Sequence, residues 1–291
     1  MTNPGPYPRR DRTSAGGPTA GPATRASRTA SWHRPPRSAG RKVPEVTALF
    51  WIIKLLTTGM GETTSDFLVH QISPFVAVAL GAVGLAGALV LQFSARRYVA
   101  WIYWLAVVMV AIFGTMAADT LHIGFGIPYV VSAAFFASAL AVIFVVWYAC
   151  EKTLSIHSVD TRRRELFYWA TVMATFALGT AAGDLTAFTL GLGFFSSGVL
   201  FAAVIAVPAL AYRLLGLNAI LAFWFAYIVT RPLGASFADW IGRAHSLGGL
   251  GLGTGPISLV LACAIICLVG YLSATRRGVA DKPAERNTRT A

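Results

Sequence analysis

Aspartate recurs at one fixed position in four apolar segments of the chain. Each copy begins with an aromatic residue and a tryptophan, has glycine ten residues after the tryptophan, and has aspartate fifteen residues after it. The four aspartates are Asp66, Asp119, Asp184 and Asp239. A charge inside a membrane helix costs roughly 2.5–3.5 kcal/mol on insertion scales, so such acids usually face a partner or a cavity. Carboxylates in that setting can bind a cation or relay a proton.

Further polar residues lie on the same helical faces as these aspartates, because residues three or four apart share a face. The positions one turn before the aspartates carry Glu62, Thr115 and Thr180, with alanine in the fourth copy. Lys54 and Arg231 extend the faces of the first and fourth copies. If the four faces converge, these side chains line a polar path. Alternatively, each aspartate caps a helix or pairs with Lys54 or Arg231 and only fixes packing.

Three histidines follow the motif aspartates within a few residues: His70, His122 and His245. Aspartate and histidine about one turn apart can share a helical face, and this pair suits divalent transition metals. The three histidines are therefore possible metal ligands. The alternative is that short polar loops contain histidine for no special reason.

The glycines and tryptophans of the motif predict how the segments pack. The glycines, each followed four residues later by another small residue, allow close helix contact; they are Gly61, Gly114, Gly179 and Gly234. The tryptophans are Trp51, Trp104, Trp169 and Trp224. Fifteen residues of helix rise roughly 22 Å, so tryptophan and aspartate lie at opposite sides of a membrane. The simplest role for the tryptophans is interfacial anchoring.

The composition indicates a membrane protein. The chain has 291 residues, of which 56% are hydrophobic and 12% charged, and its mean hydropathy is +0.63. Eight apolar segments are long enough to span a bilayer. They lie near 45–66, 74–93, 100–120, 128–149, 166–187, 192–212, 219–240 and 256–274. We therefore predict an all-α bundle of eight transmembrane helices, built from four tandem two-helix repeats at about 43–94, 97–149, 163–213 and 217–274.

The distribution of basic residues predicts the topology. Of the 24 lysines and arginines, all but Lys54, Arg231 and Arg243 lie in the tails 1–42 and 276–291 or in the loops 94–99, 150–165 and 213–218. This bias places both termini in the cytoplasm. It also explains the net charge of +12 without nucleic-acid binding. The two tails are polar and are expected to be disordered, flanking a membrane domain at 43–275.

Enzyme motifs are weak in this chain. A nucleophile elbow, a phosphate-binding loop and an HExxH sequence are missing. Pro208-Ala209-Leu210 matches a segment of intramembrane aspartyl proteases, but Ala181 stands where their Gly-x-Gly-Asp motif needs glycine before Asp184. We expect neither enzymatic activity nor a cofactor.

The four Trp–Gly–Asp units resemble those of a bacterial integral membrane family defined by four tandem repeats of unknown function. The resemblance covers about residues 43–274, including KVPEVTALFWIIKLLTTGMGETTSDF and AFWFAYIVTRPLGASFADW. It implies two transmembrane helices in each repeat, a characteristic tryptophan at each of the four motif positions, and a location in the bacterial inner membrane.

Three functions fit this sequence. The leading hypothesis is a secondary transporter or exporter of a small cation, with a divalent metal as one candidate, because five acids and only two bases lie within the spans. The second is a passive cation channel with an acidic filter. The third is a membrane scaffold in which the aspartates are structural. The expected partners are the lipid bilayer and a small cation, and the oligomeric state is left open.

Overall fold

The computed structural model describes residues 40–275, and within this range it is all-helical, as predicted, with no strand. The long helices are α1 (Ala48–Gln71), α2 (Pro74–Ser94), α3 (Ala100–Asp119), α4 (Tyr129–Glu151), α5 (Arg162–Asp184), α6 (Gly193–Leu215), α7 (Ala219–Gly242) and α8 (Thr254–Thr275). The predicted tails lie largely outside the described residues.

Seven of these helices, α2 to α8, are long and apolar enough to cross a membrane. The most apolar stretch of α3, α5 or α7 is 56–67% buried within the protein, against 17–22% for α2, α4, α6 and α8. The remaining helix, α1, carries Lys54, Glu62 and Asp66, and all three side chains are buried. The odd-numbered helices therefore form the interior, and the even-numbered helices expose their apolar residues.

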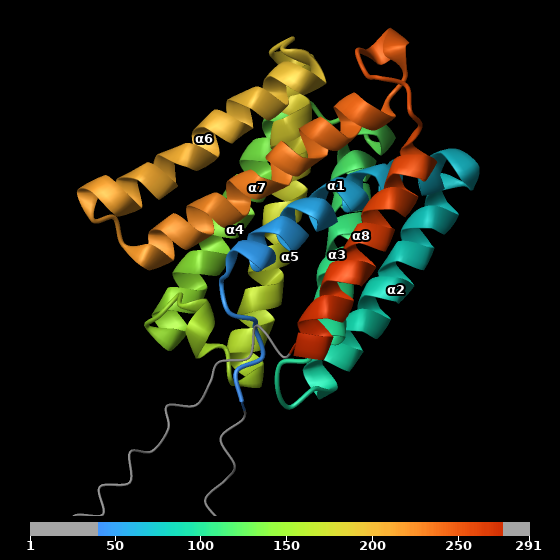
Figure 1. The fold of residues 1–291 in the computed structure, drawn as a ribbon. Helices are drawn as coiled ribbons and strands as arrows, with labels where there is room; N and C mark the ends of the chain where they lie inside the picture. Colours follow the sequence, from blue (N-terminus) through green and yellow to red (C-terminus); the bar gives the residue numbers. More distant parts are fainter. Residues whose placement is uncertain (1–39, 276–291) are drawn as a thin grey trace, which may run out of the picture. The chain divides into compact units, whose positions relative to one another are not determined.

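The odd-numbered helices form a closed ring, which we call the central ring. α1 contacts α3, α3 contacts α5, α5 contacts α7, and α7 contacts α1. Each even-numbered helix packs mainly against the ring helix that follows it, as α6 does along α7 (Figure 1). The last helix, α8, packs against the first, α1. The fourth repeat thus contacts the first, and the four repeats form a closed circle.

The segment before α1 lies across the helix ends at one end of this ring. The backbone N–H of Lys42 donates to the carbonyl of Val159 at 3.1 Å. The Lys42 ammonium pairs with Glu165 at 2.5 Å, and Gln92 donates to the other carboxylate oxygen of Glu165 at 2.9 Å. All three side chains are buried, so Lys42, which the sequence assigns to the tail, links the ends of α2 and α5.

Two ring helices end differently from the other two. α3 and α5 end at their motif aspartates and continue as π-helical turns, Thr120–Gly124 and Leu185–Thr189. Gly126 and Gly191, seven residues after the aspartates, have φ of +64° and +67°, a conformation that glycine adopts without strain. In contrast, α1 and α7 continue as α-helix past Asp66 and Asp239. Short 3₁₀ turns at Ile156–Ser158 and His245–Leu247 complete the connections.

Candidate functional site

The aromatic pairs of the four repeats form a continuous belt around the central ring. In every repeat the first aromatic residue contacts the tryptophan of the next repeat, and the fourth repeat contacts the first. The ring centroids are 5.6 Å apart for Phe50 and Trp104, 5.7 Å for Tyr103 and Trp169, 6.2 Å for Tyr168 and Trp224, and 5.7 Å for Phe223 and Trp51. Trp104, Trp169 and Trp224 are buried. These three tryptophans join neighbouring helices, so their expected role as interfacial anchors is wrong. Trp51 is only half-buried, and for it interfacial anchoring stays a prediction.

The motif glycines lie where neighbouring ring helices touch. A methyl group built on each glycine would lie under 3.0 Å from a side chain of the next ring helix. The four contacts are Gly61 with Ala111, Gly114 with Phe176, Gly179 with Arg231, and Gly234 with Thr58. Each partner residue lies seven positions after its own tryptophan. The four helices are therefore parallel and in the same register, and each motif position forms one layer of the ring.

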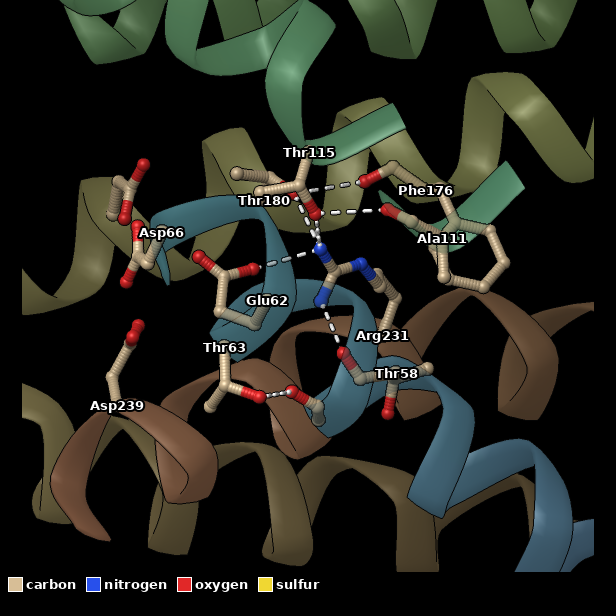
Figure 2. Close-up of polar contacts among 12 residues, drawn as sticks. Thr58, Glu62, Thr63, Asp66, Ala111, Thr115, Phe176, Thr180, Arg231 and Asp239 are labelled. Atoms are coloured by element: carbon tan, nitrogen blue, oxygen red, sulfur yellow. Dashed lines mark hydrogen bonds and ion pairs between the residues drawn. The ribbon is translucent and has the colours of Figure 1, made fainter. Parts of the chain in front are cut away.

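Arg231 occupies the middle of the ring, and its side chain is fully buried. Its guanidinium pairs with Glu62 at 2.8 Å and donates to the carbonyl of Thr58 at 3.0 Å (Figure 2). It also donates to the hydroxyls of Thr115 and Thr180, the latter at 2.9 Å. Glu62, Thr115 and Thr180 hold the same motif position in the first three repeats, where the fourth has alanine. One arginine thus ties all four repeats together.

Lys54 lies between Arg231 and the aromatic belt. Its ammonium is 4.0 Å from the ring centroid of Phe176 and 4.2 Å from that of Tyr227, which gives it two cation–π contacts. Among residues 40–275 the ammonium has no hydrogen-bond partner. Lys54 therefore pairs with none of the motif aspartates.

Beyond Arg231 the carboxylates separate into two groups. The first, which we call the arginine-balanced cluster, contains Glu62, Asp66 and Asp239, with one oxygen of each within 4.8 Å of the others. Figure 2 shows these three groups on one side of the Arg231 guanidinium. Arg243, just after α7, pairs with Asp66 at 2.7 Å and with Asp239 at 3.1 Å. Desolvation alone would lower the pKa of Arg243, but the carboxylates of Asp239 and Asp66 outweigh it and raise that pKa.

The second group, the histidine cluster, contains Asp119, His122 and Asp184, whose possible ligand atoms also lie within 4.8 Å of one another. Nδ1 of His122 is 3.5 Å from a carboxylate oxygen of Asp184. The other ring nitrogen, Nε2, is 2.5 Å from the hydroxyl of Ser132 on α4. No lysine or arginine pairs with Asp119 or Asp184 among the described residues.

Residues of both clusters line one narrow gap between helices, which is too small to hold a water molecule. It runs between α1, α5 and α7, and its polar lining includes Glu62, Asp184 and Asp239. Apolar side chains such as Phe194 close its wall. The carboxylates of all four repeats therefore gather at one end of the ring, which we call the carboxylate end, opposite the aromatic belt.

Only one of the three expected histidines joins the carboxylates. His70 and His245 are exposed, and each ring lies against a backbone carbonyl, of Asp66 at 2.6 Å and of Gly249 at 3.0 Å. The pairing of the aspartates with Lys54 or Arg231, considered from the sequence, is not observed. Arg243 takes that role in two repeats. The sequence distinguishes Arg243 only as a basic residue outside the tails and basic loops, and it gives no signal for Ser132.

Comparison with known proteins identifies the repeat. A family described as "Repeat of Unknown Function (DUF347)" matches the chain four times, over residues 49–98, 102–153, 167–216 and 222–278. Each match begins two residues before a motif tryptophan, so the matches have the register of the structural repeats. No curated protein and no solved structure matches the chain.

Proposed function

Because the chain belongs to the family defined by the Repeat of Unknown Function (DUF347), whose name assigns no activity, we propose a function from its geometry. The protein binds a small cation at the carboxylate end of its central ring and carries it across the membrane. It is a secondary transporter or exporter and performs no enzymatic reaction.

The balance of charge at the carboxylate end carries this proposal. Five carboxylates gather there, those of Glu62 and the four motif aspartates, and the two arginines paired with them balance only two. An uncompensated charge is expensive in a membrane-spanning protein, so the excess is balanced by bound cations or protons. Repeat-built transporters commonly place their binding site where the repeats meet, as these residues do.

The part of the central ring between the carboxylate end and the aromatic belt favours a carrier over an open channel. The side chains of Arg231 and Lys54 fill the axis next to the carboxylates, and the aromatic belt follows them. A cation entering at the carboxylate end therefore meets the Arg231 guanidinium, the Lys54 side chain and a layer of packed rings. Passage needs a rearrangement of the ring helices, which is the behaviour of a carrier.

The proposed topology has eight spans with both termini in the cytoplasm of a bacterium, in the inner membrane. α1 is the eighth span because its charged residues are buried in the ring rather than exposed to lipid. The carboxylate end then faces outward, since the basic loops lie at the opposite end. Reporter fusions at the two termini should both give a cytoplasmic signal, and an external signal from either would refute this topology.

Counterflow in liposomes tests the proposed transport. Purified protein is reconstituted with H⁺, Na⁺, K⁺, Mg²⁺ or Mn²⁺ inside, and uptake of the same ion from outside is followed. We expect exchange of at least one ion, lost in Asp184→Asn and kept in the control His70→Gln. Downhill flux without exchange would indicate a channel, and the lack of flux for every ion, with the protein folded, would indicate a scaffold.

A further inference from the structure

His122 presents a ring nitrogen without a hydrogen-bond partner to two carboxylates. Its side chain is only 2% exposed, and Nδ1 has no hydrogen-bond partner among residues 40–275. The 3.5 Å between Nδ1 and Asp184 exceeds the ordinary hydrogen-bond range. Two ligands each about 2.1 Å from one ion lie roughly 3–4 Å apart, so this spacing fits a shared ion.

The surroundings of Ser132 orient the imidazole for this role. The Ser132 hydroxyl lies 3.2 Å from the carbonyl of Tyr129 and 3.3 Å from that of Pro128, and both carbonyls can only accept. In the tautomer that we assign, the hydroxyl directs its proton to a carbonyl and accepts the Nε2–H of His122. The lone pair of Nδ1 then faces the Asp184 carboxylate. A hydrogen bond to the second ring nitrogen is the usual outer support of a metal-bound histidine.

Aromatic rings cover the outer side of this cluster. The Tyr129 ring packs edge-on against His122 at 4.6 Å between centroids, and Phe188 stacks on Tyr129 at 5.8 Å. Such a wall limits the access of water and fixes the histidine ring. Two acceptors that face each other away from water, here a nitrogen lone pair and a carboxylate, cost free energy unless a cation lies between them.

We propose that Asp119, His122 and Asp184 bind a divalent first-row transition metal ion, such as Mn²⁺ or Zn²⁺, through two carboxylates and Nδ1. One imidazole and two carboxylates form a mixed nitrogen–oxygen donor set, which suits these ions better than Na⁺ or K⁺. The arginine-balanced cluster is not a metal site, since guanidinium groups already pair with its carboxylates. Such an ion would be the substrate of the proposed carrier. Transport of the ion rests on the proposed function, whereas binding of the ion does not.

Pulsed EPR on the purified full-length protein with Mn²⁺ tests the site directly. We expect one tightly bound Mn²⁺ per chain with a hyperfine coupling to one imidazole nitrogen. His122→Gln should remove the nitrogen coupling and weaken binding at least tenfold, and Asp184→Asn should weaken binding by a similar factor. His70→Gln and His245→Gln are matched controls and should change neither quantity. Melting temperatures recorded for all variants separate lost binding from lost folding.

Several outcomes would overturn the metal site. Wild-type protein that binds no Mn²⁺ or Zn²⁺ would show that His122 and Asp184 share only a proton, and this result does not depend on any variant. A nitrogen coupling that survives His122→Gln would place the ion elsewhere. Counterflow of a monovalent ion without metal binding would refute the metal site alone, whereas metal binding without any flux would refute transport alone.

Discussion

Repeats one and four give the motif aspartate different partners from those in repeats two and three. Asp66 and Asp239 share Arg243, and the neighbouring Glu62 pairs with Arg231. Asp119 and Asp184 instead lie beside the imidazole of His122, and no arginine or lysine among the described residues pairs with them. The same residue in the same register therefore forms ion pairs with arginine in the half of the ring that repeats one and four form. In the half that repeats two and three form, it belongs to a group of potential metal ligands.

Helix geometry beyond the aspartate produces this difference. The regular end of α7 places Arg243 four residues after Asp239, within reach of its carboxylate. The π-helical turn after α3 carries His122 back to Asp119 and toward Asp184 on the neighbouring helix. Isolated π-helical turns occur often at functional sites, because the wider turn moves side chains relative to the rest of the helix. Each half of the ring can be disturbed separately.

The largest expected effect is on the arginine-balanced half. Arg231→Met should lower the free energy of unfolding by about 3–5 kcal/mol, because Glu62 remains buried without its partner. Reversible unfolding in lipid or detergent measures this loss. Adding Glu62→Gln should restore part of the stability, and the exposed Arg213→Met is the matched control. Equal stability of Arg231→Met and Arg213→Met would contradict the role of Arg231.

Neutralising single aspartates should separate the two halves. Asp239→Asn should lower the free energy of unfolding by about 1.5–3 kcal/mol, because it removes a charged acceptor from Arg243. Asp119→Asn removes no arginine or lysine pair and should leave stability unchanged or raised, while abolishing cation exchange. Unfolding and counterflow are measured on the same preparations. A similar loss of stability in both variants would remove the distinction between the clusters.

Enlarging a motif glycine should disturb only the half of the ring in which that glycine lies. Gly114→Ala pushes α3 away from α5 and should weaken Mn²⁺ binding. Gly234→Ala pushes α7 away from α1 and should change the Mn²⁺ affinity less. Both should cost about 1–3 kcal/mol of stability through overpacking. Gly270→Ala on α8 is the control, since nothing lies within 4 Å of the added methyl group. If all three variants behave alike, the glycine contacts do not set the helix spacing.

The smallest expected effect concerns the support of His122. Ser132→Ala should reduce Mn²⁺ affinity about tenfold, or about 1.4 kcal/mol, because the histidine loses the partner of its second nitrogen. The melting temperature should change little. Ser273→Ala removes a hydroxyl that bonds only within its own helix and should leave affinity unchanged. Titration with Mn²⁺ compares the two variants, and equal affinities would exclude a positioning role for Ser132.

The repeat and its register could be predicted from the sequence, because an identical spacing from tryptophan to aspartate places equivalent residues at equivalent heights. The order of contacts around the ring could not be predicted. Periodicity identifies which residues share a helical face, but it does not say that Phe50 contacts Trp104 or that Gly179 contacts Arg231. Those pairings depend on helix–helix packing between repeats, and they explain why three of the four motif tryptophans are buried.

The division of the site was harder to predict. Histidines follow three of the aspartates, and the α- or π-helical path after each aspartate decides which one turns inward. One signal was present: Gly126 and Gly191 stand seven residues after their aspartates, where the other two repeats have Ser73 and Ser246. Arg243 looked like a loop residue because it lies just beyond the apolar segment, although its side chain reaches back to Asp66.

The closure of α8 on α1 has a consequence for biogenesis. α1 is the first helix to be synthesised and the one that falls outside the seven clearly apolar helices, and two of its main neighbours, α7 and α8, are the last. If α1 crosses the bilayer, as we propose, its place there depends on helices that are synthesised later. A chain truncated after the third repeat leaves one side of α1, with Lys54, Glu62 and Asp66, without its cover, and presents membrane quality control with charges that the complete protein conceals.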